Sequence, residues 1–271
     1  VQEVQTQMKI IVTGGTGMMG RHLVPVLQKS GHQVIVVTRT PRRSDEISWA
    51  DPFPAVDAAI HLAGERVNAR RWSSAFLKEL YQSRVDTAQT LRAKLTDSCR
   101  VVITASGANA YPHGNLHSPP SAEDTPVSSL SQLGQLCNAW EGAWAGFPGR
   151  VVALRIGFVI ASGDSGIQNM LPIYRAGLGG VLGSGRQRMP WISIDDLIRV
   201  FLLALNDERL NGPVNVVSPQ LTTFAQFNSA FACAVNRPAF WHIPGFAVRL
   251  MFGPIADEML LCDAPVEPRK L

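Results

Sequence analysis

The sequence predicts an α/β protein with a doubly wound parallel sheet of the Rossmann type and a smaller C-terminal substrate lobe. Three observations support this fold class. Short apolar runs alternate with helical patterns over the first 161 residues, a glycine-rich turn follows the first run, and after Ala161 this alternation gives way to a glycine-rich stretch. With 271 residues, 46% of them hydrophobic, the chain has ample material for such a core.

Five β-branched apolar runs predict the strands of the first domain, because buried parallel strands read as continuous hydrophobic segments. Helical patterns separate most of these runs, and such crossovers are right-handed in parallel sheets. The expected strands are 9–13, 33–38, 57–62, 100–104 and 150–156, and the expected helices run from the glycine turn to Ser30 and over 73–95 and 130–144.

The C-terminal part is expected to form a lobe over a cleft. We place a dinucleotide-binding domain at 1–161 and the lobe at 162–271, with strands near 191–194 and 213–217 shared between the two. Residues 162–189 are rich in glycine. Further helices are expected over 195–205, 223–235 and 246–261, the last with a break at Gly253-Pro254.

Composition excludes several classes of protein. Lys and Arg number 25 against 21 Asp and Glu, and this small excess forms no basic stripe of the kind that nucleic-acid binders carry. No apolar run approaches the roughly 18–20 residues of a membrane span. Four dispersed cysteines argue against a disulfide framework or a zinc site of cysteines and fit a reducing compartment. We expect an intracellular protein, cytoplasmic or, if Val1 follows a removed targeting peptide, mitochondrial or plastidic.

The glycine-rich turn joins the first expected strand to the first expected helix. Gly14, Gly17 and Gly20 have the spacing G-x-x-G-x-x-G, with Thr16, Met18 and Met19 between them. Glycine lets the backbone turn sharply and approach a pyrophosphate, and the following helix N-terminus offers free N–H groups. A glycine trio at the head of a βαβ unit therefore predicts dinucleotide binding.

The end of the second expected strand favours NADP(H) over NAD(H). An acidic residue there would hold the ribose 2′-hydroxyl of NAD, but this strand ends with Thr38 and Arg39. Arg39 is placed to bind a 2′-phosphate, and Arg42 or Arg43 could add charge. The alternative is a solvated basic loop.

These features resemble the extended short-chain dehydrogenase/reductase superfamily, and in particular the epimerase-family proteins of its atypical branch. The resemblance runs almost end to end, through His61-Leu62-Ala63-Gly64 and Trp191-Ile192-Ser193 among other short motifs. It implies a set of residues that line the cofactor. They are Thr38, Arg39, Leu62, Ala63, Gly64, Glu79, Arg84 and Val159.

The chain departs from the superfamily at the catalytic residues. The superfamily pairs Tyr with Lys as Y-x-x-x-K, but none of Tyr81, Tyr111 and Tyr174 has a lysine four residues later. The superfamily's serine position survives as Ser106. Tyr111, in a turn expected at the mouth of the cleft, either donates a proton or makes a structural hydroxyl contact. Cys137, near the place of the missing tyrosine, is expected to be a buried structural thiol.

Two further positions limit the chemistry. Extended enzymes that act on nucleotide sugars carry an arginine just before the strand at Trp191, where this chain has Met189, with Arg188 one residue off. This departure argues against a nucleotide-sugar substrate. His113 and His117 lie in a proline-rich loop with no third ligand nearby, so we expect no metal site.

Two functions follow, in different classes. The first is an NADP(H)-dependent oxidoreductase or epimerase acting on an unknown small carbonyl or hydroxyl compound, with Ser106 and Tyr111 as its candidate catalytic residues. The second is a non-catalytic accessory subunit or assembly factor that keeps the cofactor as a structural ligand and binds protein partners in a larger complex.

Overall fold

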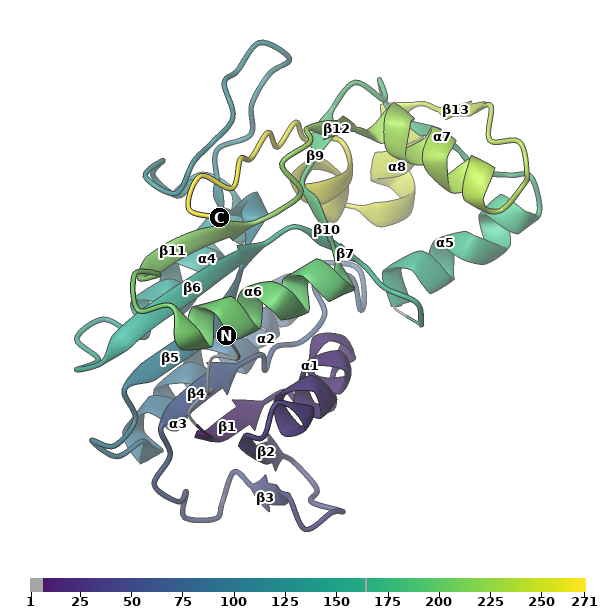
Figure 1. Ribbon diagram of the computed structural model, residues 1–271. Coiled ribbons are helices and arrows are strands. Elements are labelled where there is room, and N and C mark those ends of the chain that lie inside the picture. The colour runs from purple at the N-terminus through teal and green to yellow at the C-terminus, as the bar shows by residue number, and fades with distance from the viewer. Residues whose placement is uncertain (1–6, 164) are drawn as a thin grey trace, which may run out of the picture.

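Seven parallel strands form the central sheet, in the order β11-β6-β5-β4-β1-β2-β3 (Figure 1). The computed structural model describes residues 7–163 and 165–271. The strands are β1 (Lys9–Thr13), β2 (Gln33–Thr38), β3 (Glu46–Ser48), β4 (Ala58–His61), β5 (Val101–Gly107), β6 (Arg150–Ile156) and β11 (Gly212–Val216). The doubly wound parallel sheet predicted from the sequence is confirmed.

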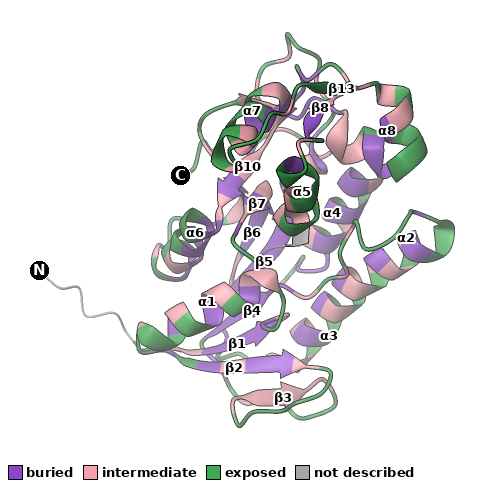
Figure 2. Cartoon of the chain, turned by 90° about the vertical axis from the view of Figure 1, so that its right-hand side faces the viewer, coloured by how far each residue is buried: buried purple, intermediate pink, exposed green. Residues whose placement is uncertain are grey.

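Helices cover both faces of this sheet. Helices α1 (Met18–Lys29) and α6 (Ile194–Asn206) pack together on one face, in front of the sheet in Figure 1. The other face carries α2 (Ser74–Tyr81), α3 (Thr87–Lys94) and α4 (Gln132–Gly142). The strands are largely buried in Figure 2, whereas each helix turns an exposed face to solvent. Two covered faces explain the continuous apolar strand runs in the sequence.

The strand order reverses between β1 and β4. From β1 the chain proceeds to β2 and β3 on one side, and from β4 it proceeds to β5 and β6 on the other. Ligands of open α/β sheets bind in the crevice that such a reversal leaves at the carboxyl ends of the strands. The glycine turn after β1 and the turn at Leu62 after β4 lie at this crevice.

The C-terminal lobe is built from small strand pairs and helices. Strand β8 (Gly180–Leu182) pairs with β13 (Trp241–Ile243), and β9 (Arg188–Met189) pairs with β12 (Thr222–Thr223). Its helices are α5 (Ser165–Arg175), α7 (Phe224–Ala234), α8 (Gly245–Phe252) and the π-helical turn η3 (Ala256–Leu260).

Two strands after Ala161 pair with strands that precede it. Strand β10 (Trp191–Ser193) pairs with β7 (Phe158–Ile160), and β11 extends the central sheet beside β6. The segments 191–194 and 213–217, expected to be shared, thus pair with strands from the first 161 residues.

Two segments differ from the sequence-based expectation. The helix expected over 73–95 is interrupted by one π-helical turn, η1 (Gln82–Asp86), between α2 and α3. The glycine-rich stretch contains α5, which the sequence analysis missed because its glycines and Pro172 obscured the helical pattern. The predicted break at Gly253-Pro254 separates α8 from η3.

No helix within 7–163 or 165–271 is long and apolar enough to cross a membrane.

Candidate functional site

The glycine turn after β1 has little room for side chains at two of its positions. Gly14 has a φ of +70°, and a Cβ there would lie 2.6 Å from the carbonyl carbon of Leu62. A Cβ on Gly20 would lie 2.4 Å from the Cα of Gly15. Both distances are far below any normal contact. Glycine therefore lets the turn approach the β4 segment and lets α1 pack closely against the turn.

Gly17 differs from these two glycines because its backbone is extended, with φ −72° and ψ 178°. A Cβ there would meet only the carbonyl oxygen of Gly14, at 3.1 Å. Gly17 and the neighbouring Thr16 are exposed. The space beside Gly17 is therefore open, as a phosphate group would require.

The N-terminus of α1 is electrostatically suited to an anion. Gly17 precedes the helix without a side-chain cap, and the first turn carries no acidic residue. The N–H groups of Met18, Met19 and Gly20 have no carbonyl partner inside a helix that starts at Met18. Together with the positive end of the helix dipole, they form a cradle that fits the pyrophosphate of a dinucleotide.

The end of β2 places an unpaired cation beside this cradle. Thr38 is the last residue of β2, and the exposed Arg39 follows it directly. Arg39 has no hydrogen-bond or ion-pair partner among the described residues. Arg43 differs, because its Nε lies 3.0 Å from Glu46 and 3.2 Å from Asp45. Of these two arginines, Arg39 is thus the one whose guanidinium is available to a phosphate.

The turn after β4 packs against both the glycine turn and a helix. The Leu62 amide donates to the Thr13 carbonyl at 3.1 Å, and the Ala63 amide donates to the Thr13 hydroxyl at 3.4 Å. A Cβ on Gly64 would lie 3.1 Å from the Arg84 side chain. The crevice therefore has one wall made by the residues that the resemblance assigns to the cofactor.

His61, the last residue of β4, is fully buried between Trp140 and Trp144, with ring centroids 5.9 Å from each. Its Nδ1 hydrogen-bonds the Thr13 hydroxyl at 2.7 Å, and its Nε2 lies 3.2 Å from the Arg84 carbonyl. A neutral ring that donates from Nε2 satisfies both contacts. Burial is the main cause that lowers the pKa of His61 to about 4. His61 therefore fixes the end of β4 and the turn that follows it as a neutral side chain.

The π-helical turn η1 positions Arg84. Its Nη2 donates to the Glu65 carbonyl at 2.7 Å, its Nη1 donates to the Leu80 carbonyl at 3.3 Å, and the guanidinium lies over the Trp140 ring. Glu79, expected to line the cofactor together with Arg84, instead forms an exposed ion pair with Arg70. The two side chains are thus not brought together, and the assignment of Glu79 to the cofactor stays a prediction.

A cavity of about 400 Å³ adjoins the carboxyl ends of β5 and β6. Of the residues that the sequence analysis selected, Met19, Arg84, Val159 and Ser106 line this cavity. Thr38, Arg39 and Arg43 do not line it, and they lie at or after the end of β2, on the opposite side of β1 from β4. The cavity is therefore the inner end of the same crevice, where Ser106 faces whatever the crevice holds.

A buried polar row runs from Ser106 across three neighbouring strands. Ser106 on β5, Arg155 on β6 and Asn215 on β11 are register partners. The Ser106 hydroxyl donates to Glu141 at 2.6 Å, and Arg155 forms a bidentate pair with the same carboxylate at 2.9 and 2.8 Å. Burial lowers the pKa of Arg155, but the hydrogen bonds and charge of Glu141 outweigh this effect and raise it overall.

Tyr111 belongs to this row rather than to the cavity wall. Its hydroxyl accepts from Arg155 at 2.8 Å and donates to Asn215 at 2.6 Å, and the residue is only 3% exposed. Burial is the main cause that raises the pKa of Tyr111. The expected location at the mouth of the cleft is therefore corrected, and the contacts of Tyr111 favour the structural interpretation of its hydroxyl.

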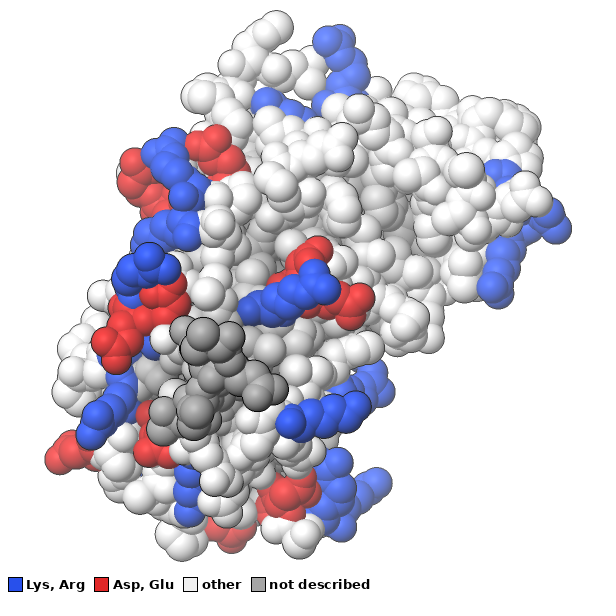
Figure 3. Space-filling view, viewed as in Figure 1, with Lys and Arg blue, Asp and Glu red and all other residues white. Residues whose placement is uncertain are grey.

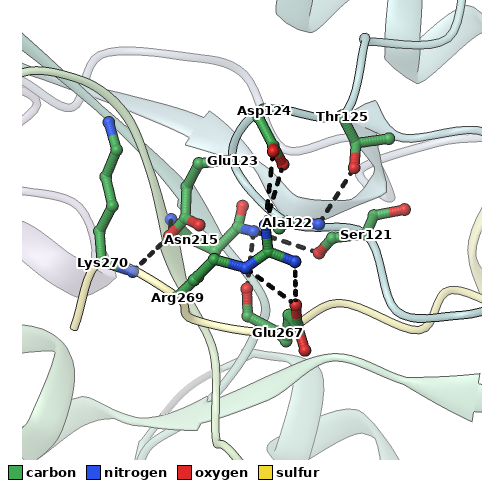
Figure 4. Close-up of polar contacts among 9 residues, drawn as sticks. All are labelled: Ser121, Ala122, Glu123, Asp124, Thr125, Asn215, Glu267, Arg269 and Lys270. Atoms are coloured by element: carbon green, nitrogen blue, oxygen red, sulfur yellow. Dashed lines mark hydrogen bonds and ion pairs between the residues drawn. The ribbon is translucent and has the colours of Figure 1, made fainter.

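The C-terminal segment closes the far end of the row (Figure 4). Asn215 Nδ2 donates to the Glu267 carbonyl at 2.9 Å, and Glu123 accepts from the backbone amides of Asn215 and Lys270. Arg269 pairs with Asp124 on the same loop. The row is thus anchored at both ends by groups that satisfy its buried polar atoms.

Sequence reasoning missed Glu141 and Arg155, the two charged members of the row. A signal for Glu141 existed, because Cys137 and Glu141 are four residues apart on α4, at the expected place of the Tyr-Lys pair. Cys137 lines the cavity, and burial raises the pKa of its thiol. The only signal for Arg155 was its position as a charged residue in an otherwise apolar strand. Its role can be assigned only once its register partners, Ser106 and Asn215, are known.

No group of three or more His, Cys, Asp or Glu side chains suited to a metal occurs in the described parts of the chain. His113 and His117 are exposed loop residues.

Comparisons with known proteins bear directly on this geometry. The model of the NAD dependent epimerase/dehydratase family matches residues 10–217, which include the glycine turn, the row from Ser106 to Asn215 and the cavity wall at β7. The chain belongs to this family.

Individual relatives agree with the family match. The epimerase family protein SDR39U1 of Bos taurus is 38% identical over 97% of this chain and 92% of its own length. The crystal structure of human SDR39U1 with NADPH has a TM-score of 0.91 at 35% identity, covering 97% of this chain and 92% of that one. A nucleoside-diphosphate sugar epimerase from Corynebacterium glutamicum has a TM-score of 0.69 at 26% identity, covering 93% and 57%. The chain is thus an epimerase-family protein with the NAD(P)-binding fold.

The buried neutral His61 makes stability depend on pH. The unfolded chain binds a proton at this histidine near pH 6.5, whereas the folded protein binds it only near pH 4. Stability from this group is therefore complete above pH 6.5 and is lost as the pH falls towards 4. We expect His61 to lower the free energy of unfolding by about 2 kcal/mol between pH 7 and pH 5. Urea unfolding at both pH values of the parent and of His61→Asn measures this difference.

In His61→Asn this part of the pH dependence should disappear, whatever the variant's stability at pH 7. His113→Asn, at an exposed loop position, is the matched control and should retain the parental pH dependence. Equal pH dependence in parent and His61→Asn would contradict a buried neutral histidine.

Substitutions of different residues of the polar row should lower the free energy of unfolding by different amounts. Arg155→Met leaves the Glu141 carboxylate without its charged partner and should destabilise the protein by about 3–5 kcal/mol. Tyr111→Phe removes one hydroxyl and should cost about 1–3 kcal/mol. Urea denaturation compares the two. A Tyr111→Phe loss as large as that of Arg155→Met would mean that the ion pair is not the main stabilising element of the row.

Proposed function

We propose that this protein is an NADP(H)-dependent oxidoreductase or epimerase that acts on a carbonyl or hydroxyl compound, with Ser106 in contact with the substrate oxygen. The observation that carries the proposal is the pair formed by Ser106 and Glu141. Ser106 lines the cavity at the inner end of the crevice and donates to a carboxylate at 2.6 Å.

The residues around the crevice fit NADP(H). The open space at Gly17 and the free N–H groups of Met18 and Met19 would hold the pyrophosphate, and Arg39 would bind the 2′-phosphate. The part of the cofactor that extends towards the cavity would be lined by four further residues. Leu62 and Ala63 lie beside Gly14, and Arg84 and Val159 line the cavity. When bound, the nicotinamide would supply or accept a hydride.

Ser106 and Glu141 provide a path for the proton. In the oxidation direction, the substrate hydroxyl passes its proton to Ser106 Oγ, while Ser106 passes its own proton to the carboxylate of Glu141. In the reduction direction, each transfer reverses. Arg155 holds the Glu141 carboxylate by two hydrogen bonds, which keep one of its oxygens within reach of Ser106.

Tyr111 has a structural role in this proposal. Its hydroxyl already donates to Asn215, so it has no proton directed towards the cavity. Its contacts hold the guanidinium of Arg155, which in turn holds Glu141.

A non-catalytic accessory subunit is the second candidate. It is favoured by the exposed apolar residues Phe246, Leu250 and Met251 on α8, since large exposed apolar side chains gather at interaction surfaces. The native mass of the isolated protein distinguishes the two: a free monomer or dimer favours the enzyme, and a stoichiometric place in a larger complex favours the subunit. All four cysteines are free thiols, three of them buried, which supports a reducing compartment for either function.

The unpaired Arg39 predicts the cofactor preference. NADP(H) should bind at least about tenfold more tightly than NAD(H), a difference of about 1.4 kcal/mol. Arg39→Ala should remove most of this difference, whereas Arg43→Ala should change it little because Asp45 and Glu46 already pair with Arg43. Titration calorimetry with all four nucleotides measures it. Equal affinities for NADPH and NADH in the parent would refute the preference.

The Ser106–Glu141 pair predicts which substitutions impair proton transfer. Ser106→Ala and Glu141→Gln should each lower turnover by about 10²–10⁴-fold, the usual worth of acid–base assistance, with NADPH affinity unchanged. Tyr111→Phe should lower turnover much less. NADPH oxidation with a reactive ketone, together with separate NADPH titration, provides the readout. A loss in Tyr111→Phe that equals the loss in Ser106→Ala would return the proton-donor role to Tyr111.

A further inference from the structure

We infer that the ligand of the inner cavity is an uncharged, largely apolar carbonyl or hydroxyl compound, and not a phosphorylated or nucleotide-linked sugar. This inference rests on the proposed function, because it names the substrate class of the same site. It is drawn from the walls of the cavity, from the partners of its charged side chains and from the character of its rim.

The wall away from Ser106 is almost entirely apolar. Helix α4, helix α7, strand β9 and the segment from α8 to η3 contribute to it. Its side chains are Leu133, Leu136, Met189, Phe224, Phe227, Phe252, Ile255, Met259 and Leu260. Such a wall stabilises apolar surface by removing it from water, and it offers nothing to a hydroxyl-rich sugar ring.

The two charged side chains that line the cavity are both engaged elsewhere. Arg188 donates to both oxygens of Asp263 and to the carbonyls of Ser118 and Asn115, so its guanidinium is directed away from the cavity. Arg84 donates to the carbonyls of Glu65 and Leu80. A diphosphate or carboxylate that entered this space would lose its hydration without gaining a free cation.

The uncharged polar side chains of the inner wall are also satisfied by the protein. Gln187 donates to the carbonyls of Leu182 and Leu260 and accepts from Ser184. Asn109 donates to the Glu258 carbonyl. Among the described residues this leaves two uncharged polar groups: the amide of the exposed Asn68, at the mouth, and the inner Ser106 hydroxyl. Ser106 can accept one hydroxyl hydrogen of a ligand, or donate to a carbonyl oxygen by turning its O–H away from Glu141.

The size and the rim of the cavity agree with a small apolar ligand. Its volume of about 400 Å³ is near the lower end of the range of about 300–1,000 Å³ found for ligand sites. Phe252 lines the cavity and is also 44% exposed, so it forms part of the mouth. Figure 3 shows few charged side chains on the one face of the lobe that it presents.

The experiment compares three probes on the NADP⁺-saturated protein, in which the cofactor site is occupied and a ketone cannot be reduced. The probes are 2-octanone, octanoate and UDP-glucose, each followed by titration calorimetry. We expect 2-octanone to bind at least about tenfold more tightly than octanoate, which has the same length and one negative charge, and UDP-glucose to give no saturable binding.

A pair of α8 variants tests whether the binding occurs in the cavity. Phe252→Ala removes a lining aromatic ring and should weaken 2-octanone binding by about tenfold. Phe246→Ala removes an exposed ring of the same helix that does not line the cavity, and it should change binding by less than about twofold. Circular dichroism checks that both variants fold.

Three outcomes would overturn the inference: octanoate binding as tightly as 2-octanone, saturable UDP-glucose binding that 2-octanone displaces, or equal effects of the two α8 variants. A separate assay of NADPH oxidation with 2-octanone tests the proposed function. Binding in the expected pattern without turnover would support the ligand class and would count against the oxidoreductase.

Discussion

The bidentate pair between Arg155 and Glu141 is the interaction on which the site depends. Arg155 is 4% exposed and lies on β6 between β5 and β11, where an unpaired guanidinium would be costly. Glu141 compensates that charge and at the same time receives the Ser106 hydroxyl. Strand register adds to this arrangement, because Ser106, Arg155 and Asn215 are register partners on neighbouring strands. The contacts that stabilise this part of the sheet are therefore the same contacts that position Ser106.

The two ends of the crevice are built on different physical terms. At the outer end, backbone N–H groups and the unpaired Arg39 favour negative charge. At the inner end, every arginine is already paired and the walls are apolar. Such a division suits a charged cofactor that extends into a site for an uncharged reactant, since each part of the complex meets an environment of its own polarity.

Local patterns predicted much of the fold. The bounds of β1, β2 and β6 agree with the apolar runs at 9–13, 33–38 and 150–156, because buried parallel strands have an unmistakable composition. The glycine turn was also recognisable from the sequence, because Gly14 and Gly20 occupy positions where a side chain would clash with the backbone. The π-helical turn at Gln82–Asp86 was not predictable, because the carbonyl of Arg84 is bound by His61 of β4, which only the tertiary structure brings there.

The candidate site was less accessible to sequence reasoning. Ser106 followed a strand and could be selected, whereas Glu141 and Arg155 acquire a role only through contacts across the chain. For Tyr111 the sequence left two roles open, proton donor or structural hydroxyl contact, and the observed bond to Asn215 favours the second.

The position of β11 at the edge of the sheet has a consequence for assembly. Ribosomal synthesis releases the chain from its N-terminus, so β6 emerges well before its outer neighbour, which comes only after β7, α5 and α6. During that interval β6 is an open parallel edge with unpaired backbone groups, and Arg155 lacks the neighbour that Asn215 provides through Tyr111. A nascent or truncated chain that stops near Ala161 would therefore expose β6 as an unpaired sheet edge. Such an edge can pair with strands of other chains, which leads to aggregation unless a chaperone covers it.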